Sequence, residues 1–247
     1  MNKTSNFRLL IAYILFSVVY ISSCVFCSLA NISECNDIQN TDTERQECPV
    51  IIIDAGHGGE DGGTIGVSGV FEKDINLKIS FDVYYTLKAA GIPVVLTRDK
   101  DMLLYDRTIN YQGRKKALDM AKRLETAISY ENSIFVSIHQ NSFSDSKYSG
   151  LQVYYSENND GSLGLAQTIQ ELCKNTLQPK NNRKCKPSQN NIYLLDNIYS
   201  PAVLVECGFL SNEKECNLLT NDSYQKEIAS IISTSIINFI QNDELKY

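Results

Sequence analysis

The sequence contains no tryptophan and only two histidines among its 247 residues. It also lacks a long basic run: 23 lysines and arginines stand against 29 acidic residues, for a net charge of -6. An acidic chain of this kind argues against nucleic acid as the main partner. No internal repeat is present, which excludes a repeat architecture. With 43% hydrophobic and 21% charged residues, the chain is neither disordered nor a protein with many membrane spans.

The N-terminus has the pattern of a targeting segment. Lys3 and Arg8 precede an uncharged apolar run from Leu9 to Ala30, which is typical of a secretory signal. Its last residues, Ser28-Leu29-Ala30, suit signal cleavage, whereas its length also suffices to cross a membrane as a helix. Ile21-Ser22-Ser23-Cys24 loosely resembles a lipoprotein cleavage site. A cleaved signal, a retained anchor and a lipid anchor stay open, and each places the rest of the chain outside the cytoplasmic membrane.

Three parts are therefore expected: a signal peptide or membrane anchor at 1–30, a polar linker at 31–48 and a folded domain at 49–247. Cys24 and Cys27 form a CxxC inside the apolar run, without the second pair that a metal site of this type needs. Secretion permits disulfides, but spacing alone does not assign their pairing. Buried free thiols are the expectation for the other cysteines, which are Cys35, Cys48, Cys173, Cys185, Cys207 and Cys216.

Within the domain, apolar runs of strand length alternate with stretches of helical periodicity, which predicts an α/β fold. The strand, helix and strand expected first form one unit, so their two strands should be parallel. The last helix is expected to begin with Asp222 as its cap, and Gln225 would complete a capping box. We expect strands at 50–53, 92–97, 134–138, 150–156, 192–195 and 202–205, and helices at 72–89, 108–129, 162–177 and 222–241.

Both histidines follow apolar strands. His57 comes shortly after the run 51–53, and His139 directly follows 134–138. Ligands of open α/β sheets bind beyond the carboxyl ends of the strands, so both imidazoles are expected at one edge of the sheet. Imidazole is a favoured zinc ligand, and a catalytic zinc site needs three protein ligands and an open position for water. The pair therefore predicts a zinc site that still needs a third ligand.

A carboxylate is the expected third ligand, and the residues leave two candidates open. Glu60 lies three residues after His57, and Glu72 stands at the start of the following helix. Asp54 could instead orient His57 from behind. Glu206 closes the apolar run 201–205, where a carboxylate is costly unless it is paired or functional. We interpret it as a catalytic base beside the zinc, which makes the protein a secreted zinc hydrolase.

Five segments resemble the motifs of the zinc-dependent N-acetylmuramoyl-L-alanine amidases, in the same order and across most of the domain. They are Asp54-Ala55-Gly56-His57-Gly58-Gly59, Glu72-Lys73-Asp74-Ile75-Asn76-Leu77, Thr97-Arg98-Asp99, Ser137-Ile138-His139-Gln140-Asn141 and the stretch from Pro201 to Asn212. The resemblance implies that His57, Glu72 and His139 hold Zn²⁺ and that Glu206 is the catalytic glutamate. It also implies a single domain with a twisted, mostly parallel sheet flanked by helices, acting on peptidoglycan at the amide between N-acetylmuramic acid and L-alanine.

Within that family the sequence most resembles the spore-cortex type, whose members remove stem peptides so that muramic-δ-lactam can form. The grounds are the stretch Gly113-Arg114-Lys115-Lys116, the segment Tyr148–Gln152, a single N-terminal apolar segment and the lack of wall-binding repeats. Ala55 and Cys207 depart from the residues common in the family, but neither is an implied ligand. A protein activator or recruiter remains open, because an acidic domain without binding repeats is a weak match for anionic wall polymers.

Two other interpretations compete with the amidase. A metallocarboxypeptidase would use Glu60 in place of Glu72 together with the two histidines, and Glu206 would again be the base. A catalytically silent protein that binds peptidoglycan as a scaffold would need none of the four residues. The choice of carboxylate separates the first from the amidase, and metal content separates the second.

Overall fold

A computed structural model describes residues 48–106, 108 and 112–242. Its centre is a six-stranded sheet with the order β2-β1-β3-β6-β4-β5. β2, β1, β3 and β6 are parallel, whereas β4 runs antiparallel to β6 and β5 pairs in parallel with β4. The sheet is therefore mixed and mostly parallel, as expected. The strands are β1 (Val50–Ala55), β2 (Val94–Leu96), β3 (Ser133–Asn141), β4 (Gln152–Tyr155), β5 (Lys186–Pro187) and β6 (Ala202–Phe209).

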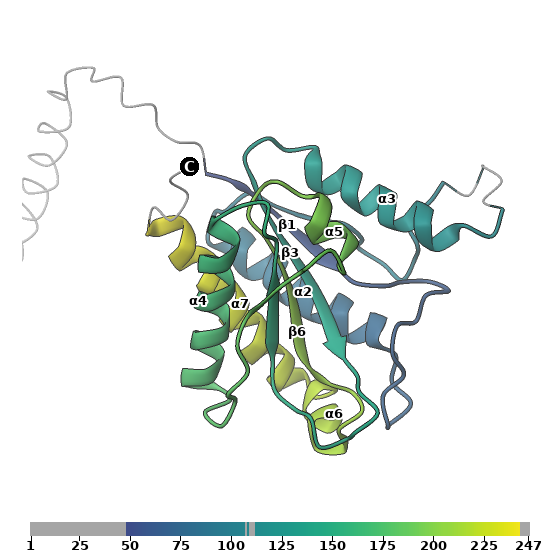
Figure 1. The fold of residues 1–247 in the computed structure, drawn as a ribbon, viewed down its shortest axis with the longest axis vertical. Coiled ribbons are helices and arrows are strands. Elements are labelled where there is room, and N and C mark those ends of the chain that lie inside the picture. The colour runs from purple at the N-terminus through teal and green to yellow at the C-terminus, as the bar shows by residue number, and fades with distance from the viewer. Residues whose placement is uncertain (1–47, 107, 109–111, 243–247) are drawn as a thin grey trace, which may run out of the picture. The chain divides into compact units, whose positions relative to one another are not determined.

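Helices cover both faces of the sheet (Figure 1). α2, α4 and α7 pack on one face, α3 and α5 pack on the other, and the short α6 follows the carboxyl end of β6. This is the flanked, single-domain α/β architecture that the alternating pattern predicted. The helices are α2 (Glu72–Ala89), α3 (Lys115–Ile128), α4 (Gly161–Thr176), α5 (Tyr193–Asn197), α6 (Glu213–Leu219) and α7 (Asp222–Gln241).

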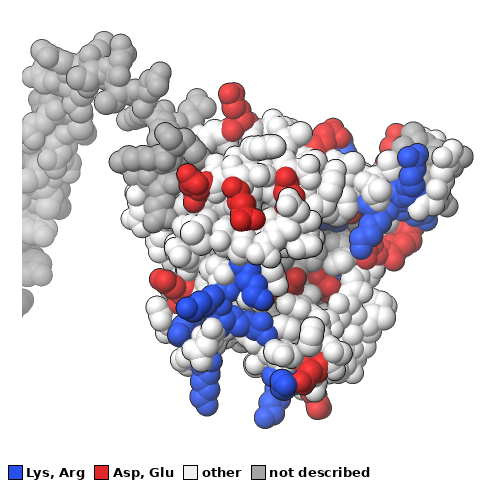
Figure 2. Space-filling model, viewed as in Figure 1, with Lys and Arg blue, Asp and Glu red and all other residues white. Residues whose placement is uncertain are grey.

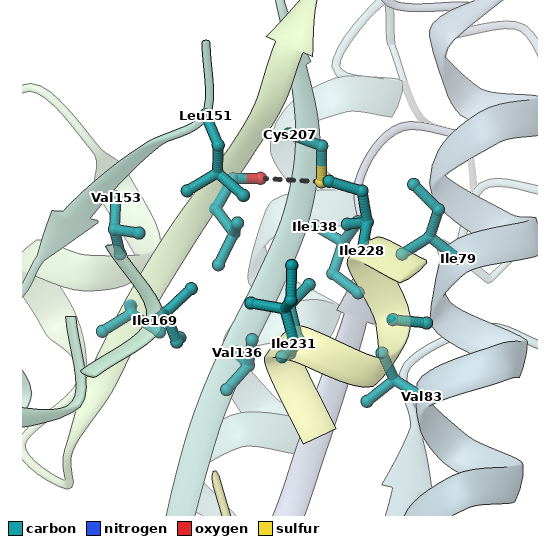
Figure 3. Packing of buried hydrophobic residues seen from close by; sticks show 14 of the residues in the cluster. Ile79, Val83, Val136, Ile138, Leu151, Val153, Ile169, Cys207, Ile228 and Ile231 are labelled. Carbon is teal, nitrogen blue, oxygen red and sulfur yellow. Dashed lines mark hydrogen bonds between the residues drawn. The ribbon is translucent and has the colours of Figure 1, made fainter. Parts of the chain in front are cut away.

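The two cores follow from strand alternation, because successive side chains point to opposite faces. On β6, Val203 and Val205 enter the larger core beneath α2, α4 and α7, while Leu204 enters the smaller core beneath α3 and α5. Cys207 continues the first set and is fully buried among aliphatic side chains (Figure 3). Alternation therefore turns Glu206 toward the face covered by α3 and α5, and Cys207 toward the opposite face. Because Cys207 is buried in the larger core, the expectation that it only packs is confirmed.

The described cysteines are free thiols. Cys173, Cys207 and Cys216 are buried, as expected, whereas Cys48 is exposed and Cys185 is only partly buried, so the expectation of burial was wrong for these two. Burial raises the pKa of the Cys207 thiol, which keeps it protonated at neutral pH. Its Sγ lies 3.8 Å from the carbonyl oxygen of Val205 (Figure 3). These thiols therefore contribute to packing.

Four local predictions were wrong or incomplete. Residues 192–195 form the start of α5 and not a strand, because a short apolar run does not distinguish the two by periodicity. α7 is capped by Asn221, whose side chain accepts from the backbone of Ser223 and Tyr224, and not by Asp222. α3 begins at Lys115, later than expected. The two-residue strand β5 was not predicted.

The predicted signal or anchor at 1–30 and almost all of the linker at 31–48 lie outside the described residues. In the described part, no helix combines the length and apolar character needed to cross a membrane. Residues 47–247 make their own compact unit. We predict that a fragment of residues 49–247 is soluble and unfolds cooperatively in urea, because its core lies entirely within this unit. Gel filtration and urea unfolding test this boundary, and an aggregated product would contradict it.

Candidate active site

The site lies at the carboxyl edge of the sheet. β1 ends just before His57, β3 carries His139 near its carboxyl end, and β6 carries Glu206. His139 and Glu206 are direct register partners on neighbouring parallel strands. Both predictions of strand-end placement are confirmed, and the sheet brings these side chains to one edge.

His57 sits in a left-handed backbone conformation with φ 61°. This conformation is uncommon for residues other than glycine, so surrounding contacts must hold it. The Arg123 guanidinium supplies one such contact by donating to the His57 carbonyl at 2.6 Å. Gly56 beside it leaves room for the His139 ring, which a Cβ at that position would strike. The glycine-rich turn therefore sets the backbone of one histidine and admits the ring of the other.

Two buried arginines hold this turn in place through hydrogen bonds to its backbone carbonyls. Arg98 donates to the carbonyls of Ala55 and Gly56 at 2.8 and 3.0 Å. Arg123 pairs with the carboxylates of Asp54 and Asp119 at 2.5 and 2.8 Å, and all three side chains are almost fully buried. The turn that precedes His57 is thus tied to α3 and to the loop after β2.

Asp54 does not orient His57 directly, so that expectation was wrong. Its carboxylate accepts from Thr97, Ser137 and Arg123 on its own face of the sheet. Burial alone would raise the pKa of Asp54, but the Arg123 guanidinium and the two hydroxyl donors hold the pKa below its ordinary value. Asp54 instead acts on His57 through Arg123, which binds both.

We predict that Arg123→Met lowers the free energy of unfolding by about 3–5 kcal/mol, because it leaves two buried carboxylates without their partner. Urea unfolding of the full chain near neutral pH measures the loss. Lys122→Met is the matched control on the same helix, since Lys122 pairs with Glu125 at the exposed surface. That change should cost no more than about 1 kcal/mol. Equal effects of the two substitutions would contradict a structural role for the buried cluster.

Three of the predicted residues converge on one point. Glu72 Oε1 lies 3.2 Å from His57 Nε2 and 3.0 Å from His139 Nδ1. One ligand atom from each residue lies within 4.8 Å of the others. Two imidazole nitrogens and a carboxylate oxygen are the donors that a catalytic zinc site uses, so this set fits the ion.

The backbone and neighbouring side chains hold Glu72 in place at the start of α2. Its Oε1 accepts from the backbone of Gln140 and from Asn76 Nδ2, and its Oε2 accepts from the backbone of Thr64. Burial would raise the pKa of Glu72, but the hydrogen bond to His139 and that to His57 hold it far below its ordinary value. Glu72 is therefore ionised and fixed, as a ligand for a cation should be.

Asp61 is the carboxylate that lies behind His57. Its Oδ1 is 3.0 Å from His57 Nδ1, on the side of the ring away from Glu72, although the two groups lack the alignment of a hydrogen bond. Burial disfavours a charged imidazole, but Asp61 and Glu72 outweigh it and raise the pKa of His57 to about 9. A carboxylate behind a ligating histidine orients its ring and increases its basicity.

Glu60, the other candidate ligand, lies outside the cluster. Its exposed carboxylate pairs with Lys115 at 3.0 Å on the surface of α3. The structure thus joins the histidines with Glu72 and separates them from Glu60.

Glu206 is half-buried, and its Oε2 is screened from solvent with no hydrogen-bond partner in the described residues. Burial raises the pKa of Glu206 to about 7, although His139 opposes the shift. A carboxyl group with this pKa takes up and releases a proton near neutral pH, which suits general acid–base catalysis.

A mostly parallel α/β sheet with two histidines and a carboxyl group of raised pKa at its carboxyl edge, beside a buried glutamate at the start of a helix, is typical of metal-dependent hydrolases. Residues 51–238 match the N-acetylmuramoyl-L-alanine amidases, and the chain belongs to this family. It is an enzyme of the peptidoglycan amidase class.

Three relatives illustrate the match. A germination-specific N-acetylmuramoyl-L-alanine amidase of Bacillus subtilis is 35% identical over 190 residues, which are 77% of this chain and 79% of the relative. The solved structure of the CwlD amidase from Clostridioides difficile, in complex with the GerS lipoprotein, is 40% identical with a TM-score of 0.74; the match covers 79% of this chain and all of that one. An amidase of Nostoc punctiforme is 31% identical with a TM-score of 0.65, over 78% of this chain and 97% of that one.

Proposed function

We propose that this enzyme is a zinc amidase that cuts the amide between N-acetylmuramic acid and L-alanine in spore-cortex peptidoglycan, which allows muramic-δ-lactam to form. The observation that supports it most is the convergence of His57, Glu72 and His139 on one point, with Glu206 as the register partner of His139. The likeness to a germination-specific amidase and to CwlD supports the cortex as the setting.

In this proposal His57, Glu72 and His139 hold the zinc. When bound, Zn²⁺ polarises a carbonyl and lowers the pKa of a water molecule to about 7. Glu206 accepts the proton of the attacking water and gives it to the departing nitrogen of L-alanine. Asp61 orients His57, while Asn76 and the backbone of Gln140 keep Glu72 in position.

Mass analysis of purified cortex peptidoglycan after digestion tests the proposal. Free stem peptides with an L-alanine amino terminus are the expected product. Release of single amino acids from the peptide ends would instead indicate a carboxypeptidase. The position of Glu60, paired with Lys115 away from the histidines, gives that alternative no support.

The location and recruitment of the enzyme form a further part of the proposal. The N-terminal segment would carry the domain across the cytoplasmic membrane and either be cleaved or hold it there. A protein partner would supply local concentration, as the complex of CwlD with a lipoprotein suggests by likeness. Fractionation of sporulating cells, with and without residues 1–30, measures the location: export of the domain without this segment would contradict its proposed role.

A further inference from the structure

His139 and Glu206 lie side by side on β3 and β6, and this row of side chains continues onto β4. Glu206 is the register partner of His139 on one side and of Gln152 on the other. Directly opposed residues on neighbouring strands point to the same face, and each strand spacing is about 4.8 Å. Gln152 Oε1 accepts from Arg183 Nη1 at 3.0 Å. Arg183 thus lies beyond Gln152, on the side of Glu206 away from the histidines.

The Arg183 guanidinium is held in a defined position. Its Nε donates to the carbonyl of Ser149 at 2.8 Å, and its central carbon lies 4.4 Å from the Phe209 ring centroid and 5.8 Å from that of Tyr148. These contacts combine hydrogen bonding with cation–π attraction. In the part of the chain that the structure describes, Nη2 has no hydrogen-bond partner, so the fork keeps donors for a ligand.

A cavity of about 740 Å³ opens beside Arg183, and Tyr148, Lys147, Lys180 and Lys214 also line it. Residues 174–186, which follow and include the end of α4, carry five basic residues and no acidic one in an otherwise acidic chain. Figure 2 shows basic side chains concentrated over the lower end of α4, where this segment lies. The cavity therefore suits an anionic ligand.

Glu215, an acidic residue on the wall of this cavity, adds one negative charge when it is ionised, against the positive charges of Arg183 and three lysines, and burial raises the pKa of its carboxyl group. The Glu215 carboxylate is 7% exposed and accepts from the backbone of Gly150 and Phe209. It belongs to the framework that shapes the wall, and its lone pairs are used there.

We propose that Arg183 binds a free carboxylate of the stem peptide. The inference rests on the proposed function, because Glu206 gives its proton to the nitrogen that belongs to the peptide. The peptide then lies on the Glu206 side of the scissile bond and the sugar on the side of the metal ligands. Arg183 stands beyond Gln152 in that row, two positions from Glu206, and offers an acidic peptide a fixed cation.

Two muramyl tripeptides that differ only in their peptide carboxylates, one free and one fully amidated, test the proposal with the full chain. Arg183→Met should raise KM for the acidic substrate about tenfold or more with kcat nearly unchanged, because a charge-assisted contact is lost in ground and transition states alike. The amidated substrate should be cut equally well by wild type and variant. Lys184→Met is the matched control: Lys184 is the exposed neighbour outside the cavity lining, and its loss should change neither substrate.

Arg183→Lys keeps the positive charge but loses the forked guanidinium, and it should give an intermediate KM. This second variant keeps the test valid if Arg183→Met fails to fold. Calorimetric binding of the released acidic peptide separates the two proposals. If the wild type cuts neither substrate but binds this peptide through Arg183, the amidase assignment fails and the peptide site stands. If wild type cuts both and Arg183→Met weakens both equally or neither, the peptide site is wrong. Equal Arg183-dependent binding of triglutamate would also overturn it, since the cavity would then take any acidic peptide.

Discussion

Glu206→Gln is expected to retain the fold and the bound zinc but to lose at least about 100-fold in the rate of amide cleavage. Glutamine has nearly the same shape and cannot accept a proton from water. Since Glu206 Oε2 is screened without a partner and burial raises its pKa to about 7, a neutral amide fits the same space. The ionised carboxylate is the less stable form there, so unfolding of the metal-free variant should require no less free energy than that of the wild type above about pH 5.

Release of stem peptide from purified peptidoglycan measures the rate, and elemental analysis measures zinc. Glu213→Gln is the matched control, because Glu213 is an exposed carboxylate on α6 and its loss should change neither quantity. A Glu206→Gln protein with full activity would remove Glu206 from the mechanism. One that lost its zinc would show that Glu206 is a metal ligand.

Glu72→Ala is expected to reduce bound zinc to less than about a tenth of the wild-type content and to abolish cleavage, because one of the three proposed zinc ligands is lost. Glu60→Ala should keep most of the metal, since Glu60 pairs with Lys115 at the surface. Zinc per protein after dialysis is the measurement, with circular dichroism as the check on folding. The reverse pattern would favour the carboxypeptidase geometry and contradict the assignment of Glu72.

Most of the sheet and the convergence of the site could be predicted from the sequence, because both depend on strong local signals. Apolar runs mark β1, β3 and β6, and parallel strands bring the residues at their ends to one edge. Residues alone left Glu60 and Glu72 open, since spacing does not say which one turns toward the histidines. The structure separates them because Glu72 starts a buried helix while Glu60 lies in an exposed turn.

What could not be predicted depends on contacts between distant segments. Asp61 lies four residues after His57, but the glycines between them give no periodicity that would place it behind the ring. Arg183 donates a hydrogen bond to Gln152, which lies 31 residues earlier in the sequence. Gln152 begins β4, and β4 pairs with the unpredicted strand β5, which follows Arg183. The apolar residues of α5 resembled a strand because only tertiary packing against the smaller core selects the helix.

The left-handed backbone at His57 has a consequence for metal exchange. A conformation of this kind costs about 1–3 kcal/mol, and the buried network of Arg123, Asp54 and Asp119 offsets that cost during folding. If His57 is a zinc ligand, as proposed above, its main chain is already set before the ion binds, so that affinity carries no ordering penalty there. Under the proposed zinc site, folding and metal uptake would be separable events, with the polypeptide folding first and binding zinc later.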